Sequence, residues 1–240
     1  MKKYCILLLL LSPLLLLRCQ EYRPQSHDFS NFYGTPAERI VKAIEKNDLR
    51  VIREEVSKNE KILNFKDPKY NVSLLSIAIL NYKKKAFEEL LKLGADPNMM
   101  AGGCGNAFDS AISYPPPNCD LFFINKLVDY GADVTLRHNN EQVEGCNSVF
   151  NNNAIIDVIK DQRDDMKCGT KMLRALTRKI GCPDLNNNNT PKYNHQNIIY
   201  ISLSIANLEA LKFFILELNC DIPDKIFIDG LIIDEANESE

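Results

Sequence analysis

The chain has 240 residues, of which 45% are hydrophobic and 25% are charged, and its formal net charge is −3. This composition is typical of a globular protein, and the length allows one large domain, two small ones or an elongated repeat array. Because a protein that binds nucleic acid needs a basic surface, the weakly acidic charge argues against a nucleic-acid partner.

The first nineteen residues differ from the rest of the chain. Lys2 and Lys3 precede an apolar run over residues 6–17 that is broken only by one Ser and one Pro. A membrane-spanning helix needs about 20 apolar residues, so this run is short for a span. A basic start followed by a short apolar run predicts a secretory signal peptide over residues 1–19.

The end of the apolar run resembles a bacterial lipoprotein signal, in which the residue after the cleaved bond is a lipid-modified Cys. Leu16 stands three places before Cys19, as in that motif, whereas Arg18 departs from the small residue expected there. The resemblance implies a lipid anchor at Cys19 and a place in the bacterial cell envelope, as a periplasmic or outer-membrane lipoprotein. The alternatives are a secreted protein and an uncleaved signal anchor.

Residues 20–35 are polar and irregular, and they predict a tether between the envelope and the folded domain. The folded domain is expected over residues 36–225. It opens with Thr35, Pro36 and Glu38 in the order of a helical capping box.

Five helix–turn–helix units follow one another in the pattern of apolar residues. The second helices of the later units are predicted to stop at Gly94, Gly131, Gly181 and Asn219, residues that suit a left-handed helix end. The separations of these stops are 37, 50 and 38 residues. Helix pairs recurring at such a period predict an all-α repeat solenoid of about five units, some of them degenerate.

Two of these units resemble the ankyrin repeat, a helix pair of about 33 residues. Residues 73–78 occupy the place of the Thr-Pro-Leu-His-x-Ala motif, and residues 90–98 fill the Leu-Leu-x-x-Gly-Ala-Asp-x-Asn motif. Residues 127–133 repeat the second motif. The resemblance implies an ankyrin-repeat solenoid that binds another protein, in which Gly-Ala-Asp shapes the helix end and is not a site.

Six cysteines remain after the signal peptide. An even number in an exported chain favours disulfides, although six cysteines allow fifteen pairings. We expect at least one bridge among Cys104, Cys119 and Cys146, for example Cys104–Cys146, and a second bridge between Cys168 and Cys182. No pair has CxxC spacing and the three histidines are scattered, so no metal site and no cofactor are expected. The six are Cys104, Cys119, Cys146, Cys168, Cys182 and Cys220.

No motif predicts an enzyme. The chain lacks GxSxG and HExxH, and its richest glycine run, residues 100–105, has neither a strand before it nor a Lys-Ser/Thr pair after it. A nucleophilic role for Cys104 is the alternative to a disulfide at that position.

The leading hypothesis is a monomeric protein-interaction module. The alternative is an envelope immunity or protective protein that neutralises a toxin or effector. Residues 226–240 are expected to form an acidic tail. Tyr, Met and Arg are enriched at interface cores, and the candidate protein-binding loop residues are Tyr70, Asn71, Met99, Met100, Phe108, Tyr114, Arg137 and His138.

Overall fold

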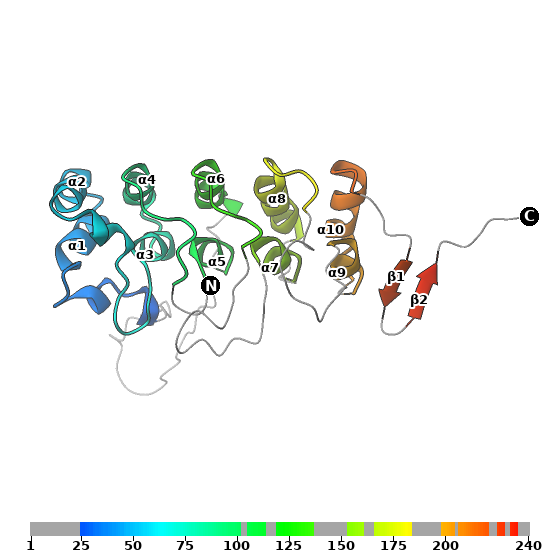
Figure 1. The fold of residues 1–240 in the computed structure, drawn as a ribbon, viewed down its shortest axis with the longest axis horizontal. Helices are drawn as coiled ribbons and strands as arrows, with labels where there is room; N and C mark the ends of the chain where they lie inside the picture. Colours follow the sequence, from blue (N-terminus) through cyan, green and yellow to red (C-terminus); the bar gives the residue numbers. More distant parts are fainter. Residues whose placement is uncertain are drawn as a thin grey trace, which may run out of the picture.

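A computed structural model describes residues 25–101, 105–113, 119–136, 153–160, 166–183, 198–204, 206–220, 225–228 and 231–234. Within these residues, ten α-helices form two rows, the inner row of odd-numbered helices and the outer row of even-numbered helices (Figure 1). Each inner helix and the outer helix after it make one unit, which gives units 1 to 5 and confirms the predicted helical solenoid. The helices are α1 (Glu38–Lys46), α2 (Leu49–Lys58), α3 (Leu74–Leu80), α4 (Lys84–Lys92), α5 (Ala107–Ser113), α6 (Phe122–Asp129), α7 (Ala154–Lys160), α8 (Met166–Thr177), α9 (Ile198–Ser204) and α10 (Leu208–Lys212), which continues into a π-helical turn, η6 (Phe213–Glu217).

Unit 2 shows how local sequence builds a helix pair. The Ser73 hydroxyl accepts a hydrogen bond from the Ser76 backbone N–H at 3.0 Å and so caps the start of α3. The chain then reverses at Tyr82, whose φ is 54°, and α4 follows. At Gly94 the φ is 97°, a left-handed conformation that glycine adopts without steric cost. The outer helix therefore ends where the sequence predicts.

The same backbone geometry recurs along the array. All four predicted stops of outer helices lie in the left-handed region, at Gly94, Gly131, Gly181 and Asn219, with φ of 97°, 82°, 67° and 56°. Left-handed residues also mark the inner-to-outer turns of four units, at Asn47, Tyr82, Cys119 and Ala206. Residues of different types thus reverse the chain at equivalent places in these units.

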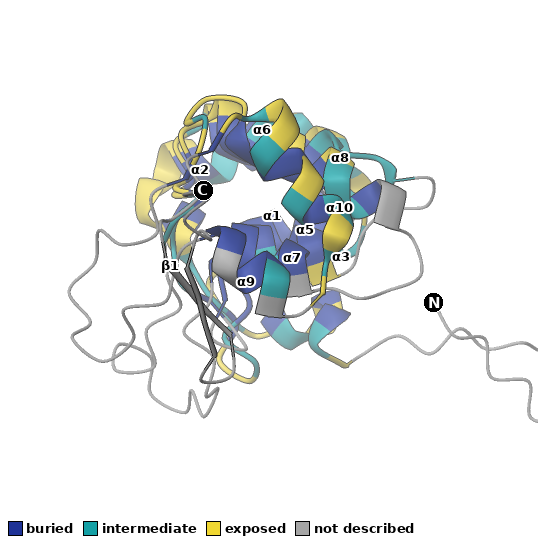
Figure 2. Cartoon of the chain, turned by 90° about the vertical axis from the view of Figure 1, so that its right-hand side faces the viewer, coloured by how far each residue is buried: buried dark blue, intermediate teal, exposed yellow. Residues whose placement is uncertain are grey.

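The hydrophobic core lies between the two rows, where the buried faces meet (Figure 2). Phe87 on α4 and Phe123 on α6 are fully buried and contact each other edge to face, with ring centroids 5.0 Å apart. These two rings join unit 2 to unit 3. Stacking of neighbours supplies the stability, since one helix pair cannot bury its own apolar face.

The segment before unit 1 is part of the core. Two 3₁₀ turns, η1 (Gln25–His27) and η2 (Phe29–Phe32), lie along the inner row below α1 and α3 in Figure 1. Phe29 and Phe32 are buried, and the Asn81 side-chain amide donates to the His27 carbonyl at 3.0 Å. The tether expected over residues 20–35 is therefore corrected for its described part, because two aromatic side chains anchor it.

A β-hairpin follows unit 5. Strand β1 (Lys225–Ile228) pairs with β2 (Leu231–Asp234) in antiparallel register, with Ile228 opposite Leu231, and β1 packs beside α9. The prediction of an acidic tail over residues 226–240 missed this hairpin. An Asp-Gly pair between two β-branched runs favours a two-residue hairpin connection, which is the signal that the prediction missed.

Candidate functional site

The loop between units 1 and 2 is built around one buried carboxylate. Lys66 and Ser73 pair in antiparallel fashion at the base of the loop. Asp67 is 1% exposed, and its carboxylate accepts hydrogen bonds from the backbone N–H groups of residues 69, 70 and 72. This network fixes the tip, where Asn71 has a φ of 57°. The loop is thus a rigid platform for Tyr70 and Asn71.

Tyr70 faces the chain itself. Its hydroxyl donates to the Gln25 side chain at 2.7 Å, so the loop tip holds the N-terminal segment in place. Tyr70 and Asn71 are half-buried. Their role as partner contacts stays a prediction, and the structure gives Tyr70 a second role as a clamp.

The next loop carries Met99 and Met100, which are both half-buried. The Ala101 N–H donates to the Gly105 carbonyl at 2.6 Å and closes the loop, while the Lys66 ammonium donates to the Met100 carbonyl at 3.0 Å. The two loops are therefore tied together.

Phe108 lies in the core, so the prediction that it is a binding loop residue is wrong. It belongs to the first turn of α5 and is 0% exposed. Asn106 caps this turn by accepting from the Phe108 N–H at 2.8 Å, and Asp109 accepts in return from the Asn106 N–H. This reciprocal cap starts the helix one residue before Phe108 and turns the ring inward. Tyr114, Arg137 and His138, the other candidates, lie outside the described residues.

Ion pairs connect consecutive outer helices. The Lys126 ammonium on α6 donates to the Glu88 carboxylate on α4 at 2.9 Å. This hydrogen bond, with a weaker one from Lys92, lowers the pKa of Glu88 despite partial burial, and the same bond raises the pKa of Lys126. On the last pair of outer helices, Arg174 donates twice to Glu217, at 2.8 and 2.7 Å. These charged side chains bind one another and so help to hold the units in register.

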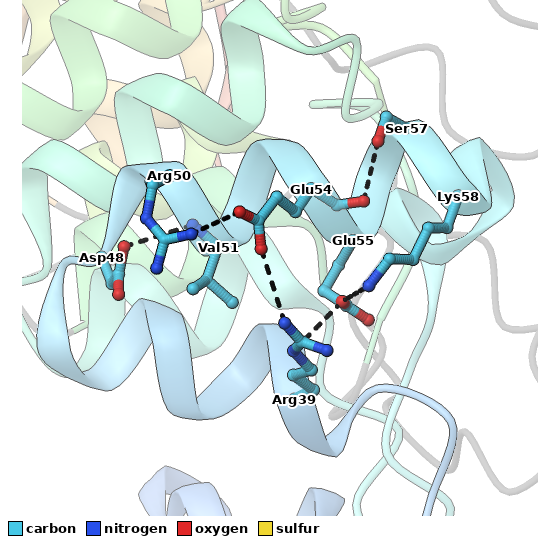
Figure 3. Close-up of polar contacts among 8 residues, drawn as sticks. All are labelled: Arg39, Asp48, Arg50, Val51, Glu54, Glu55, Ser57 and Lys58. Carbon is cyan, nitrogen blue, oxygen red and sulfur yellow. Dashed lines mark hydrogen bonds and ion pairs between the residues drawn. The ribbon is translucent and has the colours of Figure 1, made fainter.

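The first unit closes the array with charged side chains (Figure 3). Arg39 on α1 reaches Glu54 at 3.4 Å and Glu55 at 3.2 Å on α2, and Arg50 and Lys58 extend the same network. The basic side chains are more than half exposed. A polar outer face is what a terminal repeat needs for solubility.

The outer helix of the last unit exposes large apolar side chains, whereas the first unit exposes charged ones. Leu208 on α10 is 60% exposed and Leu216 on η6 is 75% exposed, the two most exposed of the large hydrophobic side chains in the described residues. Figure 1 places α10 at the end of the outer row. Other apolar side chains of the same helix, Ala210, Phe213 and Phe214, are buried.

The two disulfides among the described residues join consecutive units. Cys119 bonds to Cys168, and Cys182 bonds to Cys220, each with Cα atoms 5.5 Å apart. The predicted Cys168–Cys182 pairing is therefore wrong. The prediction assumed a bond inside unit 4, whereas stacking brings equivalent positions of neighbouring units together. Cys104 and Cys146, the other predicted pair, lie outside the described residues.

Within the described ranges, no three His, Cys, Asp or Glu side chains are grouped so that they could hold a metal ion. None of the helices in the part of the chain that the structure describes has the length and hydropathy of a membrane span.

Comparison with known proteins found similarity to a solved structure, but none to a family model or to a curated protein. The crystal structure of the human ASB11 ankyrin repeat domain matches with a TM-score of 0.44 and 15% identity, over 75% of this chain and 68% of that one. The helix pairs, their left-handed ends and the repeated contacts between units in this chain therefore carry its assignment as a helical repeat solenoid.

Proposed function

We propose that this chain is a protein-interaction module whose contact surface includes the outer helix of unit 5. The observation that carries the proposal is the exposure of Leu208 and Leu216, at 60% and 75%, on the last outer helix. Leucines at such exposure gain free energy when a partner removes them from water, at about 25 cal/mol per Å² of apolar surface. The charged face of unit 1 offers no comparable gain.

A site-specific crosslinking experiment tests this proposal. A photoreactive amino acid replaces Leu216 in one variant and Lys61, an exposed residue after α2, in a control variant. Crosslinking in the native host is expected to yield one discrete adduct at Leu216 and none at Lys61. The adduct is identified by mass spectrometry and its binding is reproduced with purified proteins.

The outcomes separate the functional alternatives. The absence of an adduct at Leu216, or the same set of adducts at both positions, would contradict the proposal. If the adduct is a toxin that loses its activity on binding, the module is an immunity protein. Any other specific protein identifies a general interaction module.

We propose further that the chain is exported and anchored through Cys19. The apolar run over residues 6–17 and the Leu16-to-Cys19 spacing support a lipoprotein signal. The two disulfides give independent support, because structural disulfides persist in oxidising compartments such as the bacterial periplasm.

Mass spectrometry of the N-terminal peptide tests the anchor. The expected mature chain begins at Cys19 and carries acyl groups, and a Cys19→Ser variant is expected to accumulate as the uncleaved precursor. A mature chain that begins elsewhere, without lipid, would instead establish secretion.

A further inference from the structure

The contacts next to the ends of the outer helices are hydrogen bonds in the early units and a disulfide in the last two. Between units 1 and 2, the Asn64 side chain accepts from the Asp96 N–H at 3.1 Å. Between units 2 and 3, the Asn98 side chain accepts from the Asp133 N–H at 2.7 Å. In each case an amide beyond one outer helix binds the residue two places after the glycine that ends the next outer helix.

The equivalent region of units 4 and 5 is joined covalently. In units 2 and 3, Ala95 and Ala132 follow the left-handed glycine directly and are buried. In units 4 and 5 that position is occupied by Cys182 and Cys220, which follow Gly181 and Asn219 and are bonded to each other. A disulfide therefore lies next to the place where hydrogen bonds join the earlier units.

The second disulfide bridges units 3 and 4. Cys119 lies in the left-handed turn between α5 and α6, and Cys168 lies in the first turn of α8. The same turn in unit 1 contributes a hydrogen bond instead, in which the Asn47 side chain accepts from the Ala86 N–H at 3.1 Å. Both bonds thus fall in the half of the array where the ankyrin-like motifs fade.

The ion pairs between the outer helices of this half are exposed to solvent. The ion pairs that join its outer helices, Arg178–Asp129 and Arg174–Glu217, lie between side chains that are about 36–52% exposed. Ion pairs at such exposure contribute little, because solvent screens them. The helix of unit 5 is also short, since α10 gives way to the π-helical turn η6 after five residues.

We propose that units 4 and 5 are an oxidation-dependent part of the fold, whereas in the residues that the structure describes no disulfide joins units 1 and 2. In an array where each unit contacts only its neighbours, loss of one interface releases the units beyond it. Reduction transfers two electrons and two protons from a dithiol to each disulfide, which gives two thiols and leaves the reagent as a disulfide. Cys182 is exposed, so a soluble dithiol reaches it directly.

Hydrogen exchange of the purified chain, residues 20–240, tests this proposal. The oxidised protein is compared with the same protein in excess dithiothreitol. Exchange of the α7, α8, α9 and α10 amides is expected to accelerate at least tenfold, while the α1 to α4 amides change less than twofold. Equal acceleration in both halves, or none in either, would overturn the proposal.

A pair of variants separates the two disulfides without a reductant. Cys182→Ala with Cys220→Ala is expected to accelerate exchange in α9 and α10 only. Cys119→Ala with Cys168→Ala is expected to accelerate exchange from α7 onward. If either double variant leaves all exchange rates as in the oxidised protein, the corresponding disulfide is not needed for the fold.

Discussion

At the scale of single residues, most of the signature sequence has a backbone role. Gly94 adopts a φ of 97°, and nothing within 4 Å would obstruct an added Cβ. The Asp96 carboxylate accepts from the Asn98 N–H at 2.8 Å and shapes the loop that follows, while Asn98 reaches unit 3. The motif therefore ends one helix and attaches the next unit, which agrees with its reading as a fold signature.

Gly94→Ala is expected to lower the free energy of unfolding by about 1–2 kcal/mol, the cost of a Cβ in the left-handed region. Gly169→Ala is the matched control, because Gly169 lies inside α8 with a helical φ and open space around it. That change is expected to stabilise by about 0.5–1 kcal/mol. Urea unfolding measures both, and equal signs would contradict the assigned conformations.

Phe108→Ala is expected to cost about 3–5 kcal/mol, as for other buried phenylalanines. The same substitution at Phe122, which is half-buried on α6, is expected to cost clearly less. Denaturant midpoints of the two variants give the comparison. A binding residue at a loop tip would show the opposite order, with little effect of Phe108→Ala on stability.

At the scale of elements, contacts along the inner row and along the outer row of helices hold the units together. The N-terminal segment covers α3, whose residues 74–79 are all buried although both of its ends lie near loops. The outer helices are joined by Glu88 and Lys126, and by Arg174 and Glu217. A helix that is apolar all round, such as α3, requires cover on every side, and the N-terminal segment supplies the cover that the repeat itself lacks.

Removal of residues 20–35 is expected to destabilise the domain by about 3–6 kcal/mol, since burial of a Phe side chain contributes about 1.5–3 kcal/mol. Phe32→Ala separates this effect from chain length, and Tyr33→Ala, at an exposed neighbour, is its control. Thermal unfolding of the three variants is the measurement. If the truncated chain unfolds at the temperature of the full one, the segment is a tether after all.

The Glu88–Lys126 pair gives a pH dependence with a defined sign. Its hydrogen bond lowers the pKa of Glu88 below the ordinary value of 4.5, so the folded state binds this proton less readily than the unfolded state. The stabilisation is present above pH 4.5 and is lost as the pH falls through the lowered value. For a partly exposed pair we expect about 0.2–1 kcal/mol. Lys126→Gln should remove this part of the pH dependence below pH 4.5, whereas Lys61→Gln should not.

At the scale of the whole molecule, the two ends of the array differ. Unit 1 ends the solenoid with Arg39, Arg50 and their carboxylate partners, whereas unit 5 exposes Leu208 and Leu216. A repeat array that is closed at both ends would carry polar outer faces on both. This asymmetry is the basis on which we propose an interaction surface on the last unit, independently of the loops that the sequence suggests.

Leu208→Ser combined with Leu216→Ser is expected to abolish partner capture and to change stability by less than about 1 kcal/mol, because surface substitutions usually fall within about 0.5 kcal/mol each. Leu176→Ser, at a fully buried position of α8, is the contrasting variant and should cost several kcal/mol. Partner affinity and urea midpoints are measured on both. Retained affinity in the double variant would move the interface elsewhere.

The repeat itself was predictable from the sequence, because its signals are local. Apolar periodicity sets each helix, and Gly94 and Gly131 end helices through a conformation that few other residues adopt. The cap residues Ser73 and Asn106 act within three residues of their own position. Such contacts depend on neighbours in sequence, and so the sequence by itself determined the unit, its period and the all-α class.

The features that the sequence missed depend on contacts between distant residues. Cys168 bonds to Cys119 and not to Cys182, because stacking places unit 3 beside unit 4. Phe32 is buried because α1 and the Phe65 ring pack beside it. Leu216 is exposed because, in the described residues, no further outer helix lies beyond η6. Burial and covalent pairing depend on which residues lie close together in space, and only the tertiary structure decided them.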